Sequence, residues 1–102
     1  MPEITISDQP ERHRYEIAVD GVRVGFAQYR ESPGELAVTH VEVDDAVGGH
    51  GLGSRLVAFL LQDARDRGLA VVPLCPFARE YIVHHPEHRD LVPEARRPAL
   101  GL

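Results

Sequence analysis

Four side chains of types that move protons or form covalent bonds stand out in the sequence: His40, Glu42, Cys75 and Tyr81. An imidazole or a carboxylate can act as a general base, and a phenol can protonate a leaving group. A thiol that comes just before a helix N-terminus gains reactivity. Each position also has an ordinary interpretation: a solvated strand face, a small buried cysteine, or half-buried aromatic packing. The residue types alone leave both interpretations open.

A glycine-rich stretch separates the first two of these residues from the last two. Four glycines fall within six positions, between a strand-like and a helix-like segment: Gly48, Gly49, Gly51 and Gly53. Glycine lets another group approach the backbone closely, and a helix N-terminus offers free N–H groups and the positive end of its dipole. The stretch therefore predicts a cradle for a phosphate or pyrophosphate. Ser54 replaces the last glycine of a dinucleotide fingerprint, and a flexible turn that binds nothing is the alternative.

Alternating apolar and polar residues before the glycines predict an antiparallel meander. The expected strands are 3–7, 14–19, 22–30 and 35–43. Asp20-Gly21 is a hairpin signal between the second strand and the third. In the last strand, a period of two places His40 and Glu42 on one face and leaves the other face to Thr39, Val41 and Val43.

After the glycines, apolar residues follow the spacing of a helix that ends at Gly68. These positions are Gly53, Leu56, Val57, Leu60, Leu61 and Ala64. Residues 69–75 are apolar and predict a buried strand, in which Pro73 indicates an edge position or a local loss of pairing. The strand–helix–strand order predicts that 69–75 is a parallel neighbour of 35–43. A second helix is expected at 76–84, beginning with a proline.

Composition limits the classes of function. The chain has 102 residues, enough for one domain, and its net charge of −5 argues against general nucleic-acid binding. The single cysteine fits a reducing cytoplasm, and no stretch predicts a signal peptide or a membrane span. His84, His85 and His88 suggest a metal site, but Pro86 interrupts their helical spacing and no further ligands complete a set. We therefore expect a cytoplasmic protein without a metal.

The order of strand, glycine turn, helix, strand and helix after a meander resembles the GNAT acetyltransferase superfamily. Two glycines of its Gln/Arg-x-x-Gly-x-Gly/Ala signature match the window 48–53, where Gly48 replaces the leading basic residue. A closer resemblance is to the short, single-domain GNAT-like proteins called N-acetyltransferase domain-containing proteins. It covers roughly residues 3–92 and is carried by Thr39–Val43, Gly49–Val57, Val72–Phe77, and Tyr81 through His85-Pro86-Glu87 to Val92.

The resemblance implies an α+β, GNAT-like fold over residues 1–93 that lacks the last GNAT strands, followed by a flexible tail at 94–102. It also implies that acetyl-CoA lies between the strands at 38–43 and 70–75, with its pantetheine arm on the main chain of Val41 and Val43. The implied phosphate-binding residues are Gly48, Gly49, His50, Gly51, Leu52, Gly53, Ser54 and Arg55. Loss of the basic residue at 48 weakens binding by about 1 kcal/mol or more, for which Arg55 is a candidate replacement.

The same resemblance implies roles for the four reactive residues. Cys75 either accepts the acetyl group and passes it on, or lines the pocket while Glu42 or His40 deprotonates an amine. Tyr81 protonates the leaving thiolate, although it falls one position closer to Cys75 than the spacing usual in the superfamily.

The implied function is acetyl-CoA-dependent N-acetyl transfer to a small amine or a protein lysine. The alternative is a non-catalytic module that binds acyl-CoA or another protein. The strands that build the acceptor pocket in a full GNAT domain are missing from this sequence. Either a second subunit of a homodimer completes the pocket, or a large acceptor docks on an open face, or there is no acceptor.

Overall fold

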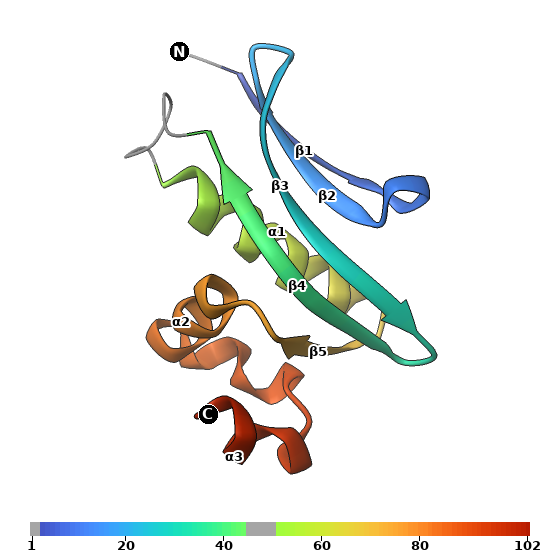
Figure 1. Cartoon of the computed structure of the whole chain (residues 1–102), viewed down its shortest axis with the longest axis vertical. Helices are drawn as coiled ribbons and strands as arrows, with labels where there is room; N and C mark the ends of the chain where they lie inside the picture. Colours follow the sequence, from blue (N-terminus) through green and yellow to red (C-terminus); the bar gives the residue numbers. More distant parts are fainter. Residues whose placement is uncertain (1–2, 45–50) are drawn as a thin grey trace.

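The computed structural model describes residues 3–44 and 51–102 and shows a five-stranded sheet in the order β1-β2-β3-β4-β5 (Figure 1). The strands are β1 (Ile4–Gln9), β2 (Arg14–Val19), β3 (Val22–Ser32), β4 (Glu35–Val43) and β5 (Ala70–Pro73). The first four pair antiparallel, and β5 is a parallel edge strand beside β4. The predicted meander, the parallel neighbour and the edge position of Pro73 are therefore confirmed.

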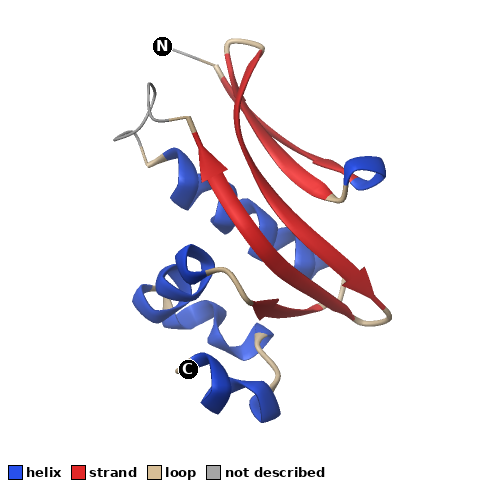
Figure 2. Ribbon diagram, viewed as in Figure 1, coloured by secondary structure: helices blue, strands red, loops and turns tan. Residues whose placement is uncertain are grey.

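Helix α1 (Leu52–Asp66) lies across one face of the sheet (Figure 2) and contacts every strand from β2 to β5. Its apolar stripe is buried as its spacing predicts: Leu52, Leu56, Val57, Leu60, Leu61 and Ala64. Against this stripe pack Tyr15, Ile17, Leu36 and Val38 from the sheet. The helix ends where expected, because Gly68 has a φ of +69° and Leu69 N–H donates back to the Ala64 carbonyl.

The C-terminal part lies beside and below β5 in Figure 1. It consists of helix α2 (Pro76–His84), the 3₁₀ turns η3 (Pro86–Leu91) and η4 (Glu94–Arg96), and the short helix α3 (Arg97–Leu100). Within the tail expected at 94–102, the Arg97 side chain donates to the Val92 carbonyl at 3.0 Å. Leu100 and Leu102 pack against the core. The division into a domain at 1–93 and a flexible tail stays a prediction.

Two β-bulges interrupt the alternation that the sequence suggests. In β3 the pairing shifts near Val24, so Val22 is 65% exposed whereas Val24 is 9% exposed. In β4 the register steps from Val38 to His40 opposite consecutive residues of β3, which leaves Thr39 as the extra residue. Strict alternation along 22–30 would place Val22 and Val24 on one face, and their environments differ because a bulge inserts a residue without a partner.

No helix in the described ranges 3–44 and 51–102 is long and apolar enough to cross a membrane.

Candidate functional site

The open edge of β4 is the main irregularity of the sheet. β5 pairs with β4 only from Glu35↔Ala70 to Val38↔Pro73. There the N–H groups of Leu74 and Cys75 both donate to the Val38 carbonyl at 3.0 Å, and the chain turns away into α2. β4 continues for five more residues along β3 alone. The predicted strand at 69–75 is thus shorter than expected, and a gap opens beside the second half of β4.

The main chain of Val41 and Val43 faces this gap. Asp44 N–H donates to the Val24 carbonyl of β3 at 2.7 Å, so the N–H and C=O groups of Val43 point away from β3. Because peptide directions alternate along a strand, Val41 has the same orientation as Val43. The open edge therefore presents N–H and C=O groups that an extended, amide-containing ligand can pair with.

The first turn of α1 lies at the end of β4 (Figure 1). Gly51 caps it in the left-handed conformation at φ +67°, and the turn contains no acidic residue. Its dipole therefore remains available to an anion. Among the predicted phosphate-binding residues, Leu52 is buried, whereas Ser54 and Arg55 are exposed. Gly48, Gly49 and His50 lie outside the described residues.

Gly53 allows α2 to approach α1 closely. A Cβ at this position would lie 2.8 Å from Cζ of Phe77. Phe77 in turn lines a cavity of about 180 Å³ together with Ser54, Glu80, Tyr81, His84 and His85. The cavity connects the N-terminus of α1 with the predicted proton donor.

Tyr81 contacts two histidine rings. Its ring stacks on His85 at 4.1 Å between centroids with 18° between planes, and His88 lies at 6.1 Å. Burial, together with the charge of Glu87, raises the pKa of Tyr81 above its ordinary value. A phenol that keeps its proton at neutral pH is suited to donate it.

Cys75 lies at the point where β5 leaves β4. It is the residue before α2, has 5% of its surface exposed and forms no disulfide. Through its N–H it is fixed to Val38, directly before the bulge at Thr39. The predicted nucleophile is therefore placed at the start of the gap.

His40 and Glu42 lie on the face of β4 opposite α1, and both are exposed. Across the strand pair, Glu42 is opposite Phe26 and His40 is opposite Gln28. The rings of Phe26 and His40 are 5.9 Å apart, a contact that the sequence analysis did not foresee. The predicted sharing of one face by His40 and Glu42 is confirmed.

The site residues thus form three groups around the second half of β4. Cys75 and the main chain lie at the gap, Tyr81 and Ser54 lie around a cavity, and His40 lies on the outer face with Glu42. The sequence analysis missed the stacking role of His85 and His88, because it considered these histidines only as metal ligands. Among the described residues, no three or more histidine, cysteine or acidic side chains are arranged to hold a metal ion.

Comparisons with known proteins identify the family and the fold of the chain. Residues 14–91 match the model of a family described as GCN5-related N-acetyl-transferase. An NMR structure of a protein described as GCN5-like, from Staphylococcus aureus, is similar with a TM-score of 0.66 and 24% identity, over 89% of this chain and 87% of that one.

A crystal structure of a Mycobacterium tuberculosis protein in complex with CoA is similar with a TM-score of 0.51 and 28% identity. The match covers 82% of this chain and 47% of that one. No curated protein sequence matches the chain. The family match and the structural likeness together confirm the expected α+β fold.

Proposed function

Because the chain belongs to the GCN5-related N-acetyltransferase family, we propose that it transfers the acetyl group of acetyl-CoA to an amine. The observation that carries this proposal is the open edge of β4, where pairing with β5 stops at Val38 and the peptide groups of Val41 and Val43 face a gap. The related M. tuberculosis protein was crystallised with CoA, which supports a CoA-type ligand.

Acetyl-CoA would bind along this edge. The amides of its pantetheine arm would pair with the peptide groups of Val41 and Val43. Its pyrophosphate would lie at the N-terminus of α1, where Ser54 and Arg55 are exposed and no carboxylate competes in the first turn. Phe77 would give the ligand an apolar wall, since it is 44% exposed in contact with Gly53.

The chemical step follows from the same placement. The nitrogen of the amine attacks the thioester carbonyl, the C–S bond breaks, and the amine loses a proton to His40 or Glu42. Tyr81 donates its phenolic proton to the departing thiolate. In the covalent route, the thiolate of Cys75 takes the acetyl group first and the amine then attacks the new thioester. The position of Cys75 beside Val38 supports either route.

Mass spectrometry tests the proposal directly. Protein mixed with acetyl-CoA is expected to show a CoA-sized non-covalent adduct under native conditions. In the covalent route, denatured wild-type protein then carries one acetyl group, which Cys75→Ala lacks. Urea-unfolded protein under the same conditions controls for non-enzymatic acetylation. Absence of any adduct at ligand concentrations on the order of 1 mM would contradict the proposal.

The second candidate function is an acyl-CoA-binding module without turnover. The exposed outer face of the sheet favours it, because no described element covers His40 and Glu42 there. A CoA adduct without acetyl transfer to any amine in a broad panel would favour the module.

A further inference from the structure

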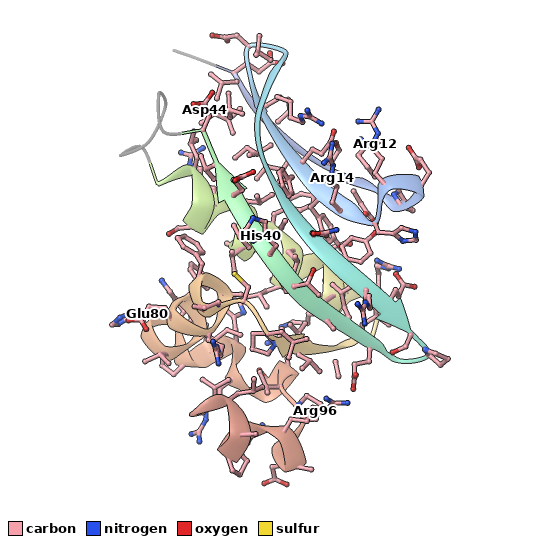
Figure 3. All side chains as sticks on the ribbon, viewed as in Figure 1. Arg12, Arg14, His40, Asp44, Glu80 and Arg96 are labelled. Carbon is pink, nitrogen blue, oxygen red and sulfur yellow. The ribbon has the colours of Figure 1, made fainter. Side chains whose placement is uncertain are left out.

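The outer face of the sheet carries two carboxylates with very different surroundings. Glu16 on β2 forms ion pairs with Arg14 at 2.7 Å, Arg12 at 3.1 Å and Arg23 at 3.3 Å. Burial alone would raise the pKa of Glu16, but the three arginines lower it. Figure 3 shows Arg12 and Arg14 on the β2 side and His40 on β4. The charge of Glu16 is therefore fully engaged within the protein.

Glu42 differs because its carboxylate has no hydrogen bond or ion pair with any described residue. It lines a cavity of about 360 Å³ at the end of the β3–β4 pair. The other lining residues are Arg23, Val24, Gly25, Phe26, Val43 and Asp44. Arg23 also lines the cavity, and its guanidinium pairs with Glu16 at 3.3 Å, which leaves the carboxylate of Glu42 available to a ligand there. Phe26 supplies an apolar wall, and the cavity has the size of a small-ligand site.

The spacing along β4 links this cavity to the reacting centre. Glu42 is two residues beyond His40 on the same face, a separation of about 6.6 Å along a strand, or about the length of a chain of four methylene groups. His40 in turn follows the bulge at Thr39, where the gap beside Cys75 begins. An acceptor with one amine at His40 would therefore place a second group, about four carbons away, beside Glu42.

We propose that the acceptor is a short aliphatic diamine or polyamine, whose reacting amine lies at His40 while its second, charged amine is bound by Glu42 in this cavity. This inference rests on the proposed acetyl transfer. The ammonium ion compensates the carboxylate of Glu42, and the methylene chain packs along Phe26. The sequence left open whether Glu42 or His40 deprotonates the amine. In this arrangement, Glu42 binds the second amine of the substrate and His40 accepts the proton of the reacting amine.

Direct binding tests the inference without turnover. Amide chemical shifts of ¹⁵N-labelled protein are followed during titration with 1,4-diaminobutane, with butylamine and 4-aminobutyrate as matched probes. The diamine is expected to shift the amides around Phe26 and Glu42 and to bind at least about tenfold more tightly than either probe. Butylamine lacks the second ammonium group that would bind Glu42, and 4-aminobutyrate has a carboxylate in its place, which Glu42 repels. Equal affinities, shifts elsewhere, or no shift at tens of millimolar would overturn the inference.

Two variants sharpen this titration. Glu42→Gln is expected to weaken binding of the diamine about tenfold, whereas Glu94→Gln, an equal change of charge on the exposed turn η4, leaves it unchanged. Preserved dispersion of the amide spectrum shows that each variant is folded. Equal weakening in the two variants would reveal a general charge effect and would overturn the inference.

Steady-state acetylation separates binding from proton transfer. Glu42→Gln is expected to raise KM for 1,4-diaminobutane about tenfold and KM for butylamine much less. An equal loss of kcat/KM for both amines would assign Glu42 to proton transfer and overturn the binding role. If the protein binds CoA but not the diamine, only this inference fails. If it binds the diamine but not CoA, the proposed acetyl transfer fails while the diamine site stands.

Discussion

The two halves of β4 belong to one strand but have different neighbours. From Glu35 to Val38 the strand is enclosed by β3 on one side and β5 on the other, and Leu36 and Val38 are fully buried under α1. From the bulge at Thr39 to Val43, it is paired with β3 alone. The side chains of the second half alternate between partly buried valines and the exposed His40 and Glu42.

The difference shows how one strand provides both stability and a binding edge. The first half satisfies its peptide groups within the sheet and buries apolar side chains, which stabilises the fold. The second half keeps peptide groups open toward a gap, and such an edge is suited to pair with a ligand. The bulge marks the boundary, because it increases the local twist at the place where β5 departs.

The largest expected effect is on stability, at Leu36. Leu36→Ala removes a fully buried side chain from the enclosed half and is expected to lower the free energy of unfolding by about 2–5 kcal/mol. Val43→Ala, in the open half, is expected to cost less than about 1.5 kcal/mol because Val43 is only partly buried. Urea denaturation measures both. Equal losses would show that the two halves contribute alike and would break the comparison.

The next largest effect concerns catalysis at the open half. Tyr81→Phe keeps the ring that stacks on His85 but removes the proton donor, and is expected to lower kcat about 10²-fold. Burial and Glu87 raise the pKa of Tyr81, so the phenol stays protonated above its ordinary range. Loss of rate through deprotonation of Tyr81 is therefore expected at a higher pH than for an ordinary tyrosine. A variant as active as wild type would remove Tyr81 from the mechanism.

The sequence predicts the enclosed part of the molecule well, for reasons that are local. The α1 stripe has a helical period, Asp20-Gly21 adopts the positive φ angles that a tight hairpin needs, and Pro76 begins α2 as expected. In each case, neighbouring residues along the chain determine the structure. The pairing of β4 with β5 also follows, because strand–helix–strand connections have few solutions.

The open part was predicted less completely, because its features depend on contacts between distant residues. The bulge at Thr39 arises because His40 pairs with Gln28 and Val38 pairs with Tyr29. The alternation of residue types within β4 does not reveal this register. Tyr81 and His85 have the i, i+4 spacing of a helix, but the contact of Tyr81 with His88 depends on the turn at Pro86 that follows α2. The gap lies where the family resemblance implied, but the cavity between Glu42 and Phe26 came only from the three-dimensional arrangement.

A substitution at Gly25 is expected to have an intermediate effect on stability. Gly25 faces Val43 across the open half, and a Cβ there would lie 2.7 Å from the Glu42 carbonyl oxygen. Because a backbone atom cannot move aside cheaply, Gly25→Ala is expected to cost about 1–3 kcal/mol. Gly53→Ala is the control, since it meets only the far end of the Phe77 ring and is expected to cost less than about 1 kcal/mol. Thermal unfolding of both variants measures the difference, and the reverse order would contradict it.

The smallest expected effect is at the bulge itself. The Thr39 hydroxyl donates to the Gln28 carbonyl at 3.2 Å, across the pair of strands where the register shifts. Thr39→Val keeps the shape of the side chain and removes this hydrogen bond, at a cost of about 0.5–1.5 kcal/mol.

Thr5→Val on β1 is the matched control for the Thr39 variant, since the Thr5 hydroxyl makes no hydrogen bond to any described residue. If the hydroxyl of Thr39 stabilises the bulge, hydrogen exchange of the His40 and Glu42 amides, which point toward β3, accelerates in Thr39→Val, while the exchange of Leu36 and Val38 is unchanged. Equal behaviour of the two variants would show that the bulge is held by the burial of Val38 and Val41 on either side of it. In that case, the boundary between the enclosed and the open half is set by packing against α1 and not by the hydroxyl.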